Sequence, residues 1–255
     1  MKLKYFQLFL FALLGLVLST PSFSQGLSSF GLPAVIADPG ANGQTEYSLS
    51  LQILALMTAI TVLPSLVLGM TAFTRIIIVL SILRQALGTQ QTPPNQVLIA
   101  IALFLTYYIM SPIFDVIYLE TVNPYLNGSL GTQEALSRGS AVLKDFMVSN
   151  TRTDTLNMFA DLSETGPFQD KQSIPLSIVL PAFITSELKT AFEIGFLIFL
   201  PFLVIDMVIA SILMSLGMMM LSPMLISLPF KLLLFVLVDG WAMTVGSLSS
   251  TFLVD

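Results

Sequence analysis

Two long apolar runs, separated by a turn, constrain this chain more than any other feature. Between Glu193 and Asp239 only two charged residues occur, Asp206 and Lys231. A helical hairpin that turns at residues 217–223 would bring these charges level, each roughly 17–19 Å from the tip. A charge in an apolar helix is costly and indicates a functional site. We expect the two to pair, within one chain or between neighbours, either as such a site or only to fix the hairpin register.

Three consecutive methionines, Met218, Met219 and Met220, stand at the expected turn. Gly217 and Pro223 favour a break in the helix on either side of them. Methionine is unbranched and adaptable, so it suits surfaces that must repack. Several copies of such a loop in a ring would form a deformable apolar constriction. Ordinary core packing is the alternative, because 13 methionines among 255 residues make some clustering expected.

Composition limits the class of protein. The chain is 55% hydrophobic and 10% charged, whereas a soluble domain carries about 25% charged residues. We therefore expect an integral membrane protein or a component of an apolar assembly. Cysteine and histidine are absent, which excludes Cys–His catalysis, thiolate metal sites and disulfides. The ten Lys and Arg residues are scattered and give no basic stripe for nucleic acid. No cofactor is expected.

The first residues are typical of an export signal. Residues 1–24 combine Lys2 and Lys4, an apolar stretch, and small residues before Gln25, a pattern that predicts a cleaved signal peptide. An uncleaved first transmembrane helix is the alternative, although the apolar stretch is short for a span. Cleavage would leave Gln25 on the periplasmic side. Residues 25–47, rich in Gly, Ser, Pro and Ala, are expected to be a mobile periplasmic stretch.

Residues 48–114 are predicted to form a first apolar hairpin. The run 51–73 is long enough to cross a membrane, and Pro64 is expected to kink it. The apolar run is expected to continue through Arg75 to Arg84. By the positive-inside rule both arginines lie towards the cytoplasm, which agrees with a periplasmic N-terminus.

The second half combines a polar insert with another apolar hairpin. Residues 115–173 hold eight acids against four bases, with apolar side chains at helical spacing, which predicts a small soluble helical insert. Residues 174–255 form the second hairpin, with Pro201 as an expected kink. Broken helices at membrane depth are tolerated only where they are buried in protein or line a cavity. We therefore expect an all-α, membrane-type protein of two broken apolar hairpins around the insert, in a multi-subunit channel or gate.

Three sequence blocks are more specific than the composition. The blocks are Phe73-Thr74-Arg75-Ile76-Ile77-Ile78-Val79 through Pro93-Pro94-Asn95-Gln96, then Pro181-Ala182-Phe183 through Thr185-Ser186-Glu187-Leu188-Lys189, and Phe202–Asp206 through Gly217–Met220 to Lys231 and Val238-Asp239-Gly240-Trp241. Together they resemble the FliP/SctR family of type III secretion export-gate proteins. The resemblance runs from about residue 48 to the end, and the triple methionine and the signal look like the flagellar branch.

The resemblance implies an assembly that composition alone does not. Family members form a helical, closed gate of five such copies with four FliQ and one FliR, docked to FlhB and FlhA. The gate belongs to the bacterial inner membrane and flagellar basal body, with the complex partly at periplasmic level. The resemblance also implies that Met218, Met219 and Met220 form a gasket closing the pore, and that Asp206 and Lys231 are a charged pair.

The leading hypothesis is a non-enzymatic pore subunit that passes unfolded flagellar subunits across the inner membrane. No Walker-type motif is present, so energy would come from the proton gradient and a separate ATPase. The alternative is a proton-coupled transporter with Asp206, Glu187 and Glu193 as relays. An intramembrane protease would need Asp206 and Asp239 about 3 Å apart, whereas the hairpin places them at different levels. Further polar candidates for assembly or function are Glu187, Lys189, Arg75, Arg84 and Asp239.

Overall fold

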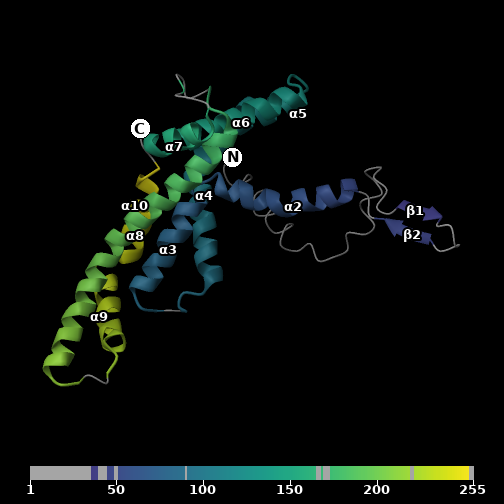
Figure 1. Cartoon of the computed structure of the whole chain (residues 1–255). Coiled ribbons are helices and arrows are strands. Elements are labelled where there is room, and N and C mark those ends of the chain that lie inside the picture. The colour runs from purple at the N-terminus through teal and green to yellow at the C-terminus, as the bar shows by residue number, and fades with distance from the viewer. Residues whose placement is uncertain are drawn as a thin grey trace. The chain divides into compact units, whose positions relative to one another are not determined.

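The computed structural model describes residues 36–39, 45–48, 51–89, 91–164, 168, 173–218 and 221–252 (Figure 1). The predicted signal peptide and most of residues 25–47 lie outside them. The all-α prediction is confirmed, with one short sheet added. The elements are β1 (Ile36–Pro39), β2 (Thr45–Ser48), α2 (Leu51–Gly69), α3 (Phe73–Ala86), α4 (Asn95–Ile117), a π-helical turn (Tyr118–Val122), α5 (Asn123–Leu126), α6 (Thr132–Ser149), α7 (Thr153–Leu162), α8 (Leu176–Ser215), α9 (Pro223–Leu237) and α10 (Gly240–Ser250).

The chain divides into two compact units after Ser65. In the first unit, β1 and β2 form an antiparallel pair in which Ile36 lies opposite Ser48 and Pro39 opposite Thr45. This pair falls in the stretch expected to be mobile, and it precedes the start of α2. The second unit, from Leu66 onward, contains the remaining helices.

The first apolar run is interrupted where the sequence predicted that it would continue. Helix α2 passes through Pro64 without ending, and the run breaks at residues 70–72 instead of continuing to Arg84. The Thr71 hydroxyl donates to Leu68 O and accepts the N–H of Phe73. Because a threonine side chain that bonds nearby backbone competes with the helical pattern, the break follows Gly69 rather than the proline.

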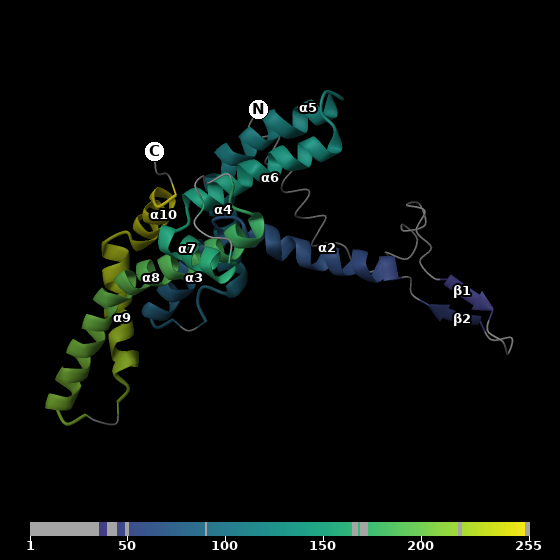
Figure 2. The ribbon, with the colours of Figure 1, turned by 45° about the horizontal axis from the view of Figure 1, so that its top comes forward.

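Helix α8 organises the second unit. It is a single helix of 40 residues that continues through Pro181 and Pro201, and it packs against α3, α6, α7 and α9. Figure 1 and Figure 2 show α9 returning alongside its C-terminal half. At the crossing with α3 the contact is so close that a Cβ on Gly195 would lie 2.4 Å from Ile82 Cδ1. The two helices can therefore approach this closely only with glycine at the contact.

The polar insert has no sharp boundary at its start. Helix α4 continues beyond residue 114 through the π-helical turn into α5, giving a helical stretch of 32 residues, Asn95–Leu126. Helices α6 and α7 follow, within the stretch that apolar spacing predicted to be helical. Helix α6 packs against both α4 and α8, so the insert is continuous with the apolar helices.

A second break separates α9 from α10, which meet at 63°. Asp239 occupies this break with a φ of +50°, in the left-handed region that Asp enters more readily than most residues. A Cβ on the next residue, Gly240, would lie 2.2 Å from the ring of Phe235. Glycine is therefore required where the chain bends back against α9.

Much of the apolar surface of the second unit is uncovered by its own chain. Among the described residues, two helical stretches are long and apolar enough to cross a membrane, Asn95–Leu126 and Leu176–Ser215. The number of spans rises to four if each of the broken helix pairs, α2–α3 and α9–α10, counts as one span. Only 11% of the most apolar window of α8 is buried. Apolar surface of this extent is normally covered by lipid or by other subunits.

Candidate functional site

A polar junction joins three helices, α3, α8 and α9, within the second apolar hairpin and at the end of α3. Lys231 Nζ on α9 lies 2.6 Å from Asp206 Oδ2 on α8 and donates a 3.1 Å hydrogen bond to the carbonyl oxygen of Ala86, the last residue of α3. The Ser227 hydroxyl donates to Asp206 Oδ1 at 2.5 Å. The two charges expected to stand level are thus in contact, within one chain.

The contact with Ala86 gives the lysine a second function. The last carbonyl groups of a helix lack partners within it, and a cation there interacts favourably with the helix dipole. Lys231 is 2% exposed, so its ammonium depends on these two acceptors in place of water. The junction therefore fixes the α8–α9 hairpin to the end of α3 as well as fixing the hairpin register.

Sequence reasoning missed Ser227 and Ala86. Ser227 lies four residues before Lys231, on the same face of α9, and this spacing was a usable signal. It is fully buried, where a hydroxyl needs a partner. Nothing in the local sequence points to Ala86, because it contributes a backbone carbonyl from a distant part of the chain.

The hairpin tip begins with a glycine-terminated helix end. Gly217 has a φ of +72°, its N–H donates to Met214 O at 3.0 Å, and the N–H of Met218 donates to Leu213 O at 2.9 Å. These two bonds form the Schellman motif that commonly ends helices. Met218, directly after it, is 44% exposed. Met219 and Met220 lie outside the described residues.

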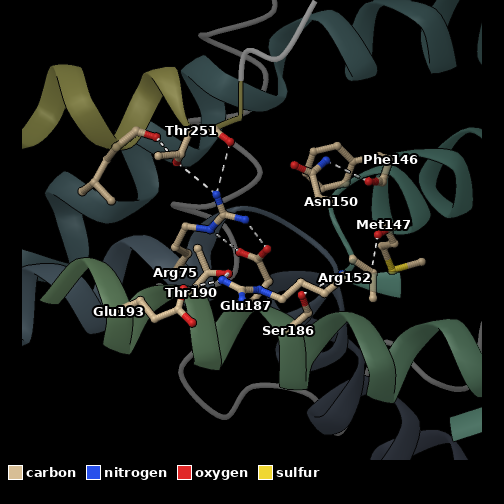
Figure 3. Close-up of polar contacts among 12 residues, drawn as sticks. Arg75, Phe146, Met147, Asn150, Arg152, Ser186, Glu187, Thr190, Glu193 and Thr251 are labelled. Atoms are coloured by element: carbon tan, nitrogen blue, oxygen red, sulfur yellow. Dashed lines mark hydrogen bonds and ion pairs between the residues drawn. The ribbon is translucent and has the colours of Figure 1, made fainter. Parts of the chain in front are cut away.

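A second buried ion pair lies near the other end of α8 (Figure 3). Arg75 Nη2 and Nε donate to the two carboxylate oxygens of Glu187 at 2.5 and 2.8 Å. Arg75 Nη1 donates to the carbonyl oxygen and the hydroxyl of Thr251 at 3.3 and 3.0 Å, and the guanidinium carbon lies 3.7 Å from the centre of the Phe252 ring. This centre therefore joins α3, α8 and the segment after α10.

The geometry of Arg75 matches its chemistry. Guanidinium presents a planar fork of donors that fits a carboxylate with two parallel bonds. Glu187 is fully buried and Arg75 nearly so. Because a proton relay needs contact with water or with another titratable group, this arrangement favours a structural role for Glu187 over a relay.

The start of α7 is attached to α8 beside this centre. The backbone N–H of Arg152 donates to Ser186 Oγ at 3.1 Å, and its guanidinium forms an ion pair with Glu193 and a 3.4 Å bond to Thr190 Oγ1 (Figure 3). Arg152 and Glu193 are partly exposed, so this ion pair contributes little to stability. The buried Ser186 contact carries more of the attachment.

The remaining candidates are dispersed. Arg84 Nη1 donates to Asn95 Oδ1 at 2.6 Å and to Pro93 O at 3.2 Å, which closes the connection from α3 to α4. Lys189 and Asp239 are exposed and have no ion-pair partner among the described residues. The structure also does not pair Asp239 with Asp206, since Asp206 is occupied by Lys231 and Ser227.

The polar groups of α8 and α9 are arranged for structural connection rather than for bond chemistry. In the described part of the chain, no three His, Cys, Asp or Glu residues gather in a way that could hold a metal ion. Glu187 and Asp206 are each bound to a cation, and the contacts of Arg75 with Glu187 and of Lys231 with Ala86 O link helices far apart in sequence. The arrangement holds the hairpin in position relative to the other helices of the unit.

Comparisons with known proteins agree with the sequence blocks. The sequence model of the FliP family matches residues 56–248. The "Flagellar biosynthetic protein FliP" of Cereibacter sphaeroides is 68% identical over 87% of this chain and 73% of that protein. The proteins of the same name from Pectobacterium carotovorum subsp. carotovorum and Bacillus subtilis (strain 168) are 51% and 50% identical, over 87% and 80% of this chain and 86% and 93% of their own lengths. The chain belongs to the FliP family.

Proposed function

We propose that this chain is a pore-forming subunit of the flagellar type III secretion export gate. The observation that carries the proposal is family membership over residues 56–248, together with relatives named for flagellar biosynthesis. In this role the protein passes unfolded flagellar subunits across the bacterial inner membrane. It acts as a component of the export apparatus and catalyses no reaction itself.

The exposed apolar helices support a role in an assembly. Helix α8 carries large apolar side chains along its length, and many of them are exposed on the single chain. Five copies, joined by FliQ and FliR and docked to FlhB and FlhA, would cover these surfaces. The assembled complex would lie in the inner membrane and the flagellar basal body, partly at periplasmic level.

The hairpin tip supports a gating role for Met218, Met219 and Met220. The Schellman end of α8 orders the chain up to Met218, and Pro223 starts α9 shortly afterwards. In the sequence, the three methionines thus stand between the end of α8 and the start of α9. A resting gate must exclude ions and later admit a polypeptide, and soft apolar side chains that repack can do both.

The proton-coupled transporter is the weaker candidate. It requires Asp206 and Glu187 to take up and release protons during a cycle. Glu187 is fully buried and bound through both oxygens to Arg75, while Asp206 is bound to Lys231 and Ser227. Each proton uptake would have to break a buried ion pair, and this favours the gate.

The gasket is tested by shortening the three methionines to alanine together. We expect the variant to assemble, because the loop contributes little to packing, and to leak ions, seen as raised single-channel conductance or loss of membrane potential. The matched control changes Met243 to alanine, an exposed methionine on α10 away from the tip, and is expected to stay closed. Leucine at the three positions should keep the seal and slow export. An assembled alanine variant as tight as wild type would refute the gasket.

A further inference from the structure

Two charges on the second apolar hairpin have no ion-pair partner in the part of the chain that the structure describes. Between Leu176 and Ser250 the sequence contains six charged residues. Glu187, Glu193, Asp206 and Lys231 each have an ion-pair partner within the chain. The other two, Lys189 and Asp239, have none among the described residues. They are opposite in sign, and both are exposed.

Lys189 borders an apolar face of α8. Phe192 and Phe196 follow it at spacings of three and seven residues, so the three side chains share one face of the helix. Both phenylalanines are about three-fifths exposed, at 59% and 61%. Whatever covers these rings also reduces the contact of the neighbouring ammonium with water. Once covered, the ammonium needs a negative partner.

Asp239 borders an apolar face of α9. Shortly before it in the sequence stand three of the most exposed apolar residues of the unit, Leu233, Val236 and Leu237. Asp239 also stands at the N-cap of α10, where the helix dipole favours a negative charge, but its side chain makes no capping hydrogen bond there and has no ion-pair partner among the described residues. Its exposed carboxylate is therefore available to a cation from another chain.

Helix geometry opposes pairing of these two charges within one chain. The contact between Asp206 and Lys231 fixes one common level of the hairpin. Both residues lie on the side of that level away from the hairpin turn. At 1.5 Å per residue, Lys189 lies roughly 25 Å from it along α8, and Asp239 lies roughly 12 Å from it along α9. The two are thus displaced by about 13 Å along the hairpin, which exceeds the reach of a single ion pair.

We propose that Lys189 of one copy pairs with Asp239 of the next copy, with the phenylalanine face of α8 packed on the exposed face of α9. The inference rests on the proposed function, which supplies several copies side by side. Because the two faces differ, the contact is heterologous and repeats from copy to copy instead of closing a two-fold dimer. The displacement of the two charges also makes each copy step along the axis relative to its neighbour.

Cysteine cross-linking tests the contact directly, because the natural chain contains no cysteine. The full chain carrying Lys189→Cys and Asp239→Cys is produced with its export apparatus in a flagellated host, and membranes are oxidised before non-reducing electrophoresis. We expect a ladder of covalently linked copies. Each single variant should stay monomeric, since neither position meets its own equivalent. Thr185→Cys, exposed one turn away on α8, combined with Asp239→Cys should cross-link more weakly.

Charge exchange provides a second measurement. Lys189→Asp and Asp239→Lys should each lower the yield of the multi-copy complex several-fold, and the two together should restore most of it. Native mass measurement of the reduced cysteine variant shows whether the complex has formed. If that complex forms and no ladder appears, or if the second cysteine links to a different protein, the inference is refuted and the proposed function stands. If wild type forms no multi-copy complex, the proposed function itself fails.

Discussion

The junction of Asp206, Ser227 and Lys231 predicts an unequal effect of removing its two charges. Asp206→Ala leaves Lys231, 2% exposed, with only Ala86 O as an acceptor. Lys231→Ala leaves Asp206 with the Ser227 hydroxyl as a donor, and the Asp206 side chain, 32% exposed, is the less buried of the two charges. Removing one partner of a buried pair costs about 3–5 kcal/mol. We expect Asp206→Ala near the upper end of that range and Lys231→Ala near the lower end.

Ser227→Ala completes the series at a smaller cost. It removes one hydrogen bond to a charged acceptor, worth about 1.5–3 kcal/mol, and leaves the ion pair intact. Ser227→Thr keeps a hydroxyl and serves as the control for loss of the donor, although its added methyl enters a fully buried site. The expected order of destabilisation is therefore Asp206→Ala, then Lys231→Ala, then Ser227→Ala.

Exchanging the two charges distinguishes the contribution of the Asp206–Lys231 ion pair from that of the contact between Lys231 and Ala86 O. Asp206→Lys combined with Lys231→Asp restores opposite charges across α8 and α9. It also places a carboxylate beside the carbonyl of Ala86, at the negative end of the α3 dipole. The exchange should therefore recover only part of the stability that Asp206→Ala loses.

Thermal unfolding of the detergent-solubilised complex, followed by loss of its native size, measures this series, and export of flagellar subunits gives the functional readout. Equal amounts of each variant in the membrane are the control for expression. If Lys231→Ala is as damaging as Asp206→Ala, the burial argument fails. Full recovery by the charge exchange would mean that the Ala86 contact contributes nothing.

Two further substitutions test other contacts. Glu187→Gln keeps the shape of the side chain but leaves Arg75 buried without a counter-charge, so we expect a loss of about 3–5 kcal/mol, measured by thermal unfolding; an unchanged midpoint would contradict the buried pair. Gly195→Ala places a methyl group against Ile82 and should cost about 1–3 kcal/mol. Adding Ile82→Ala should return part of that loss, and the absence of any recovery would show that the crossing of α3 and α8 is not as tight as described.

Local pattern predicted those features that depend on neighbouring residues. The level placement of Asp206 and Lys231 follows from counting residues on either side of the turn, since two helices of constant rise must bring them together. The Gly217 and Pro223 limits of the turn follow from the backbone preferences of those residues. The helices of the polar insert follow from apolar spacing.

The features that sequence did not predict depend on contacts between distant segments. The first apolar run was expected to continue from residue 51 to Arg84, yet it breaks after Gly69, where the Thr71 hydroxyl bonds the backbone. Arg75 was expected to be a charge on the cytoplasmic side and a polar candidate for assembly or function, but nothing near it in the sequence indicates that Glu187 and Thr251 will surround it. A backbone acceptor such as Ala86 O cannot be recognised from the sequence, because every residue has a carbonyl group.

The partners of Arg75 set an order of events during synthesis. Glu187 is made 112 residues after Arg75, and Thr251 is made 176 residues after it. At translation rates of 5–20 residues per second, the guanidinium waits roughly 10–35 s for its last acceptor. During that interval the first apolar helices already exist with an unneutralised charge between them. The core around Arg75 therefore closes only after the segment beyond α10 has emerged, and neighbouring copies can pack against a closed core only from that point onward.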